Sequence, residues 1–132
     1  MTEKSIFVVE DDGIIDLNSY EMLTKSGYAV PEMFASGEEL LDHLEQSELP
    51  DLILMDVLLA GGMDGIETAR QVRDRYHVPV IFVTACSDDR TCAALKELAP
   101  DGWVVKPFIP ERLFSLIACT LESHDRQKIC DG

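Results

Sequence analysis

The chain has 132 residues, of which 46% are hydrophobic and 27% are charged, so it can bury the core of one domain. Its 25 acidic residues outnumber 11 basic residues, which gives a formal net charge of −14 at pH 7. This balance argues against a nucleic-acid partner and against binding to an anionic membrane, because both require clustered Lys and Arg.

Apolar runs and cysteines narrow the class of protein further. The longest apolar runs are far shorter than a transmembrane helix, so we expect no membrane insertion, and the polar residues 1–5 are unlike a signal peptide. The four cysteines lack CxxC spacing and a suitably placed histidine, which disfavours a zinc site. Scattered cysteines without a signal peptide indicate reduced thiols and a cytoplasmic location.

The first part of the chain alternates apolar runs with a helical pattern. Residues 6–9 predict a buried strand that ends in three acids, at positions 10–12. A helical spacing of apolar residues follows, and Gly27 is suited to cap the carboxyl end of that helix. Residues 28–34 indicate a weaker strand, which Pro31 restricts to the edge of a sheet.

The second helix and the central strand have clearer signals. Residues 36–39 read Ser-Gly-Glu-Glu, a capping-box pattern that predicts a helix start. Pro50 ends that helix, and the apolar residues 52–55 then lead directly to Asp56. Four apolar residues without alternation indicate a strand covered on both faces. Asp56 is therefore held at a strand end, where a ligand can reach it.

Two helices and a strand are predicted after the central strand. Asp64 can cap the third helix, and residues 78–83 predict another buried strand, which ends at Thr84. A fourth helix is predicted to start at Asp88 or Asp89.

The last strand and helix complete the alternation. Residues 103–105 predict a short strand that ends at Lys106, and Pro110 suits the first turn of a final helix. From Glu122 onward the sequence is mostly polar, and we expect it to fray. The buried side of this helix is predicted to contain Leu113, Leu116, Ile117 and Leu121.

Five strands that alternate with five helices imply a parallel sheet with helices on both faces. Ligands of such sheets bind at the carboxyl ends of the strands. The polar residues expected there are Glu10, Asp11, Asp56, Thr84 and Lys106. Clustered carboxylates require a cation or a raised pKa, and Mg²⁺ suits their hard oxygen atoms. A lysine and a hydroxyl beside the metal suit the oxygens of a phosphoryl group, with Asp56 as the nucleophile.

The chain resembles the receiver domains of two-component response regulators over about residues 4–122. The pieces that match, in the order and spacing of that family, are Val8-Val9-Glu10-Asp11, Leu54-Met55-Asp56, Gly62-Met63-Asp64-Gly65-Ile66-Glu67, Val83-Thr84-Ala85 and Val104-Val105-Lys106-Pro107-Phe108. The resemblance implies a flavodoxin-like α/β fold, with a five-stranded parallel sheet in the order 2-1-3-4-5 and helices on both faces. We expect a receiver domain over residues 1–122 and a polar tail or linker stub over 123–132.

The resemblance also implies roles at the metal site. Asp56 corresponds to the phospho-acceptor, Asp11 to a direct Mg²⁺ ligand and Glu10 to an acid that acts through a coordinated water, while the backbone carbonyl of Leu58 completes the protein ligands. Mn²⁺ is an alternative metal. The acids that follow the first strand leave a second register open, Asp11 with Asp12, but the four apolar residues before Glu10 favour the first.

Three further residues correspond to the family's phosphoryl-binding and switching groups. Thr84 is expected to hydrogen-bond the phosphoryl group and Lys106 to pair with it, so that both act with Asp56 in the transfer. Trp103 occupies the position of the switch aromatic, which turns inward when the threonine moves. The phosphodonor implied is a phosphohistidine of a sensor kinase or a phosphotransfer protein.

Phosphoryl lifetime in the family depends on the residues two after the acceptor and two after the threonine. Here these are Leu58 and Cys86, neither of which orients an attacking water well, so slow self-dephosphorylation is expected. Leu58 also argues against a turnover phosphohydrolase, which carries an Asp at that position. A flavin carrier of similar fold is disfavoured because residues 10–12 would repel the flavin phosphate.

The sequence therefore predicts a signalling switch rather than a turnover enzyme, with output through protein–protein contacts. The alternative is a receiver module of a larger hybrid sensor kinase or multidomain regulator, acting as a phosphorelay intermediate. We expect a monomer or a phosphorylation-dependent dimer.

Overall fold

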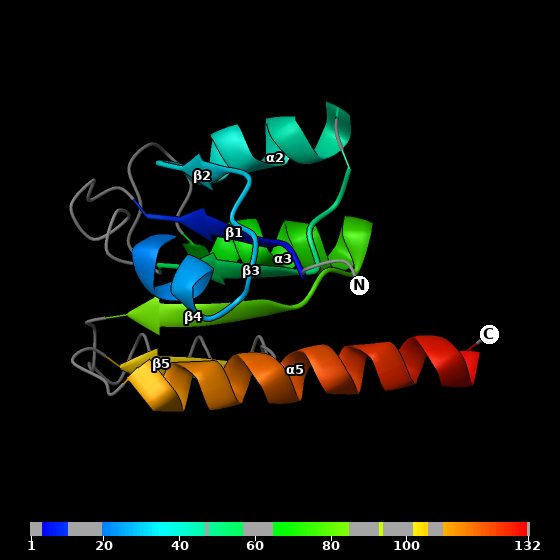
Figure 1. The fold of residues 1–132 in the computed structure, drawn as a ribbon. Coiled ribbons are helices and arrows are strands. Elements are labelled where there is room, and N and C mark those ends of the chain that lie inside the picture. Colours follow the sequence, from blue (N-terminus) through cyan, green and yellow to red (C-terminus); the bar gives the residue numbers. More distant parts are fainter. Residues whose placement is uncertain are drawn as a thin grey trace.

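The chain folds around a parallel sheet with the predicted strand order (Figure 1). The structure, a computed structural model, describes residues 4–10, 20–46, 48–56, 65–84, 93, 102–105 and 110–131. The strands are β1 (Ile6–Val9), β2 (Met33–Phe34), β3 (Leu52–Met55), β4 (Val80–Thr84) and β5 (Gly102–Val105). They pair in the order β2-β1-β3-β4-β5, and every pair is parallel. The α/β fold and the order 2-1-3-4-5 are thus confirmed.

Helices cover both faces of the sheet (Figure 1). The named helices are α2 (Gly37–Gln46), α3 (Gly65–Tyr76) and α5 (Pro110–Asp131), and residues 20–25 are also helical. The pair α2 and α3 lies on one face, and residues 20–25 lie with α5 on the other. The fourth predicted helix falls outside the described residues, apart from Ala93, which is helical.

The two faces of the sheet bury two separate apolar clusters. Alternate residues of the central strands point to opposite faces, so Ile53 packs with α2 and α3 whereas Leu52 packs with α5. Both side chains are fully buried, as are Ile81 and Phe82 of β4 on the two faces. Burial on both faces explains why these strands have continuous apolar sequences rather than alternating ones.

The edge strand β2 is shorter than predicted. Residues 28–34 were expected to form one strand, but the structure has an isolated bridge between Ser5 and Ala29 and then only Met33–Phe34. Pro31 lies between the two paired segments and has no N–H to donate to β1. The predicted edge position of this strand is confirmed.

The predicted capping box opens α2. The Ser36 hydroxyl accepts a hydrogen bond from the Glu39 backbone N–H at 3.2 Å. In return, the Glu39 carboxylate accepts from the Ala35 N–H at 3.2 Å, one residue before the donor that a standard box would use. In the turn after the helical residues 20–25, Gly27 has φ of 95°, as expected of a residue that ends a helix.

The final helix is longer than the sequence indicated. It starts at Pro110 as predicted but continues through Asp131, past Glu122, where fraying was expected. Three of its four predicted core residues are buried, whereas Leu116 is only partly buried because it lies beside the edge strand β5. The domain boundary at residue 122 stays a prediction. Among the described residues, no helix is long and apolar enough to cross a membrane.

The close approach of α2 and α3 generates a test of the packing. A Cβ added to Gly37 would overlap the hydroxyl of Thr68, whose side chain is fully buried. Overpacking costs roughly 1–3 kcal/mol and alanine's higher helix propensity offsets part of that, so we expect Gly37→Ala to lower the free energy of unfolding by about 1–2 kcal/mol. Urea denaturation measures the change.

Glu38→Ala is the control for Gly37→Ala, because Glu38 is the next residue of the same helix and is exposed. This change should leave the urea midpoint nearly unaltered. A Gly37→Ala midpoint equal to that of the wild type would contradict the described contact.

Candidate functional site

The pairing of β1 with β3 sets two acids side by side. Val9 is the register partner of Met55, and these are the last residues of their strands, so Glu10 and Asp56 follow at the same level. The Asp56 N–H donates to the Val9 carbonyl oxygen at 3.0 Å. Backbone pairing thus continues one residue beyond the strands and positions both acids.

Glu10 is fixed from its other side by the edge strand. Its N–H donates to the Phe34 carbonyl oxygen at 2.9 Å, and the residue is only 7% exposed. Asp56 is half-buried, so one of the two acids is enclosed while the other remains accessible. A buried acid beside a second carboxylate is a site where positive charge is favourable.

The other strand ends reach the same edge of the sheet. Thr84 is the last residue of β4 and pairs with Val105, the last residue of β5, and Lys106 follows directly. All strands run in one direction, so their carboxyl ends gather at one side of the molecule (Figure 1). The structure therefore brings the backbones of Glu10, Asp56 and Thr84 to a common edge.

The described residues include part of the predicted site. Asp11, Leu58, Cys86 and Lys106 lie outside the described residues, and only the backbone of Thr84 is described. Their roles stay predictions.

Glu10 and Asp56 fit a hard divalent cation. Two carboxylates on adjacent strand ends supply the oxygen donors that Mg²⁺ takes in proteins. Groups of three or more His, Cys, Asp or Glu suited to a metal are absent from the described residues, and the third predicted acid, Asp11, lies outside them. The two described carboxylates are therefore compatible with Mg²⁺.

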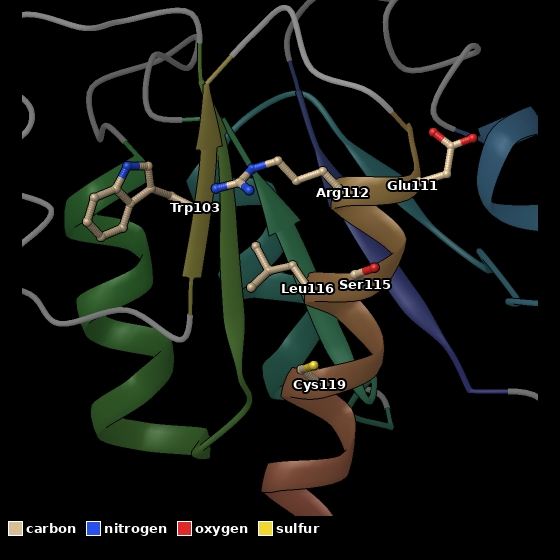
Figure 2. A pocket seen from close by; sticks show the side chains of 6 residues that line it. All are labelled: Trp103, Glu111, Arg112, Ser115, Leu116 and Cys119. Atoms are coloured by element: carbon tan, nitrogen blue, oxygen red, sulfur yellow. The ribbon is translucent and has the colours of Figure 1, made fainter.

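Trp103 lies on the edge strand, two strands from the one that carries Asp56. Its side chain is partly buried and packs against the cluster beneath α2 and α3. It also borders a groove beside α5 of about 470 Å³ (Figure 2). The lining residues are Trp103, Glu111, Arg112, Ser115, Leu116 and Cys119.

Sequence reasoning missed this groove, although the polar residues of α5 at helical spacing were visible. The signal was the exposed series Arg112, Ser115 and Cys119, on the side of the helix away from Leu113, Ile117 and Leu121. The predicted inward movement of Trp103 on phosphorylation stays a prediction.

Comparison with known proteins identifies relatives of the whole domain. The family model for the response regulator receiver domain matches residues 6–118. The chain is also similar to several solved structures. One is the N-terminal domain of a response regulator/sensory box/GGDEF three-domain protein from Carboxydothermus hydrogenoformans, at 30% identity and a TM-score of 0.85, covering 94% of this chain and 98% of that one.

Two further similar structures come from other kinds of protein. A CheY-like response regulator receiver domain protein from Methanospirillum hungatei is 26% identical with a TM-score of 0.84, covering 96% of this chain and 99% of its own. The receiver domain of a signal transduction histidine kinase from Syntrophus aciditrophicus is 28% identical with a TM-score of 0.82, covering 91% of each chain. The same fold thus occurs in regulators and within a kinase.

Proposed function

Since the chain belongs to the response regulator receiver domain family, which acts in two-component signalling, we propose that it is a switch controlled by phosphorylation of Asp56. The observation that supports this assignment most directly is the register of β1 and β3. It sets Asp56 at the end of the central strand, half-buried and level with the buried acid Glu10. An accessible carboxylate beside an enclosed one suits an acceptor next to a metal ligand.

In the transfer step, a carboxylate oxygen of Asp56 attacks the phosphorus of a phosphohistidine on a sensor kinase or phosphotransfer protein. The new bond joins phosphorus to oxygen, the phosphorus–nitrogen bond breaks, and its electron pair returns to the imidazole. Lys106 pairs with the phosphoryl oxygens and Thr84 donates a hydrogen bond to them. These two residues orient the group without taking part in a new covalent bond.

The metal site uses residues from two strand ends. Asp11 and Asp56 would hold Mg²⁺ directly, the backbone carbonyl of Leu58 would complete the protein ligands, and Glu10 would act through a coordinated water. Bound Mg²⁺, with Mn²⁺ as an alternative, supplies positive charge to the phosphoryl oxygens during transfer. Receiver domains typically bind Mg²⁺, which agrees with this ligand set.

The partners follow from the same reaction. A histidine kinase of the cytoplasm, or a phosphotransfer protein, provides the phosphoryl group, and a downstream protein recognises the phosphorylated domain. The chain is not a turnover enzyme, because its product is its own modified Asp56. The similar domains from a three-domain regulator and a histidine kinase support the alternative that this receiver is one module of a phosphorelay protein.

Labelling with a small-molecule donor tests the proposed function. The wild-type chain incubated with acetyl phosphate and Mg²⁺ should gain one phosphoryl group by intact mass spectrometry, and Asp56→Asn should gain none because it lacks the nucleophile. Asp74→Asn is the matched control, since Asp74 is an exposed acid of α3. Equal labelling of the wild type and Asp56→Asn would refute the assignment of Asp56.

Metal binding is measurable without phosphoryl transfer. At a Mg²⁺ concentration ten times its dissociation constant, mass action should stabilise the folded chain by about 1.4 kcal/mol. Thermal unfolding of the wild type should show this increase, and Glu10→Gln and Asp56→Asn should each reduce it. NaCl at matched ionic strength is the control, because simple screening also stabilises a chain of net charge −14. An identical Mg²⁺ effect in all three proteins would contradict the site.

The phosphorylated state is predicted to last minutes or longer at neutral pH with Mg²⁺. Leu58 and Cys86 offer no group to orient an attacking water, so Leu58→Gln should increase the first-order loss of phosphate, on the order of tenfold. A Phos-tag gel sampled over time measures both rates. Loss within seconds from the wild type would contradict the prediction, as would a Leu58→Gln rate equal to it.

A further inference from the structure

We propose that His43 of α2 is a positioning residue for Glu10, an inference that rests on the metal site proposed above. The two residues are linked through Phe34, the last residue of β2, which lies at the edge of the sheet beside α2 (Figure 1). The carbonyl oxygen of Phe34 accepts the hydrogen bond from the Glu10 N–H at 2.9 Å. A side chain that fixes Phe34 therefore also fixes the backbone of Glu10.

The backbone pairing of β2 is short. The strand contains only Met33 and Phe34, and Pro31 has no N–H with which to extend the pairing toward the preceding residues. The hydrogen bond from the Val8 N–H to the Glu32 carbonyl oxygen is 3.5 Å long, which is weak. A two-residue edge strand with such a bond opens easily, so the end of β2 depends on the packing of its side chains.

Three rings from three elements pack together beneath β2. The ring centroid of Phe34 lies 5.5 Å from that of Phe7 and 5.3 Å from that of His43. The third pair, Phe7 with His43, is 5.4 Å apart, so each ring contacts the other two at distances typical of favourable aromatic pairs. Phe7 is buried in β1, whereas His43 is half-buried and closes the cluster from the helix side. The position of Phe34 against β1 therefore depends on His43.

The start of α2 supports the same link. Glu39 lies one turn before His43, so both side chains extend from the same side of the helix. The Glu39 carboxylate accepts from the N–H of Ala35, the residue directly after Phe34. This contact is exposed and therefore weaker than the ring cluster, which makes His43 the position to test.

Glu10 and Asp56 differ in their dependence on α2. The Asp56 N–H donates to the Val9 carbonyl oxygen, so β1 and β3 hold it at the centre of the sheet. The Glu10 N–H instead donates to the edge strand that packs on His43. Loss of the His43 ring should therefore loosen the backbone of Glu10 and leave that of Asp56 in place.

Amide hydrogen exchange tests this link without any metal. In the full chain, followed by NMR, His43→Ala should speed exchange of the Glu10 amide about fivefold relative to the Asp56 amide, because two ring contacts are lost. A general loss of stability would speed both amides alike, so the ratio of the two rates isolates the effect at Glu10. His43→Phe retains a ring at this position and should return the ratio to within about twofold of the wild-type value.

Metal affinity measures the consequence at the site. Electron paramagnetic resonance of free Mn²⁺ gives the dissociation constant of each folded variant. His43→Ala should weaken Mn²⁺ binding about threefold, less than the loss of a direct partner of a metal ligand, because His43 acts through Phe34. His43→Phe should retain the wild-type affinity. His77→Asn is the matched control, since it removes an exposed imidazole at a φ of 58° that Asn tolerates, and it should change neither measurement.

The two measurements separate this inference from the proposed function. An exchange ratio unchanged by His43→Ala would overturn the positioning role of His43. So would a faster Glu10 amide with unaltered Mn²⁺ binding, or a His43→Phe variant that fails to restore the ratio. A wild-type chain that binds no Mn²⁺ would instead refute the proposed metal site, while the exchange ratio would still decide whether His43 holds the backbone of Glu10.

Discussion

The parallel pairing of β1 with β3 is the constraint on which the rest of the site depends. It aligns Val9 with Met55 and continues into the hydrogen bond from the Asp56 N–H to the Val9 carbonyl oxygen. Because both strands are buried on both faces, a slip of one residue would send their apolar side chains to the wrong helices. The packing of the core therefore fixes the relative position of Glu10 and Asp56, with no need for a direct bond between them.

The sequence was sufficient for those features that depend on local patterns. Continuous apolar runs predicted the central strands, and Ser36 with Glu39 predicted the start of α2. Pro31 correctly predicted an edge strand. The predicted length of this strand was wrong, because tertiary contacts decide which of its residues pair with β1. Leu116 had the periodicity of a core residue, but it lies where the sheet ends, which no local pattern reveals.

Trp103 lies between the core near Asp56 and the groove beside α5. It packs against the cluster beneath α2 and α3, which also contains Met55, the residue before Asp56. On its other side it borders the groove beside α5. A movement of Trp103 would therefore alter both the core near Asp56 and the wall of the groove beside α5. This position gives the proposed switch a physical route from the strand ends to the surface beside α5.

Fluorescence of Trp103, the single tryptophan of the chain, tests the central claim most directly. Beryllofluoride, with which a related receiver domain was activated, mimics a phosphoryl group on the acceptor. Adding it with Mg²⁺ should change the emission of the wild type and leave that of Asp56→Asn unaltered. An equal response in both proteins, or none in the wild type, would contradict an acceptor at Asp56 that is coupled to Trp103 on the edge strand β5.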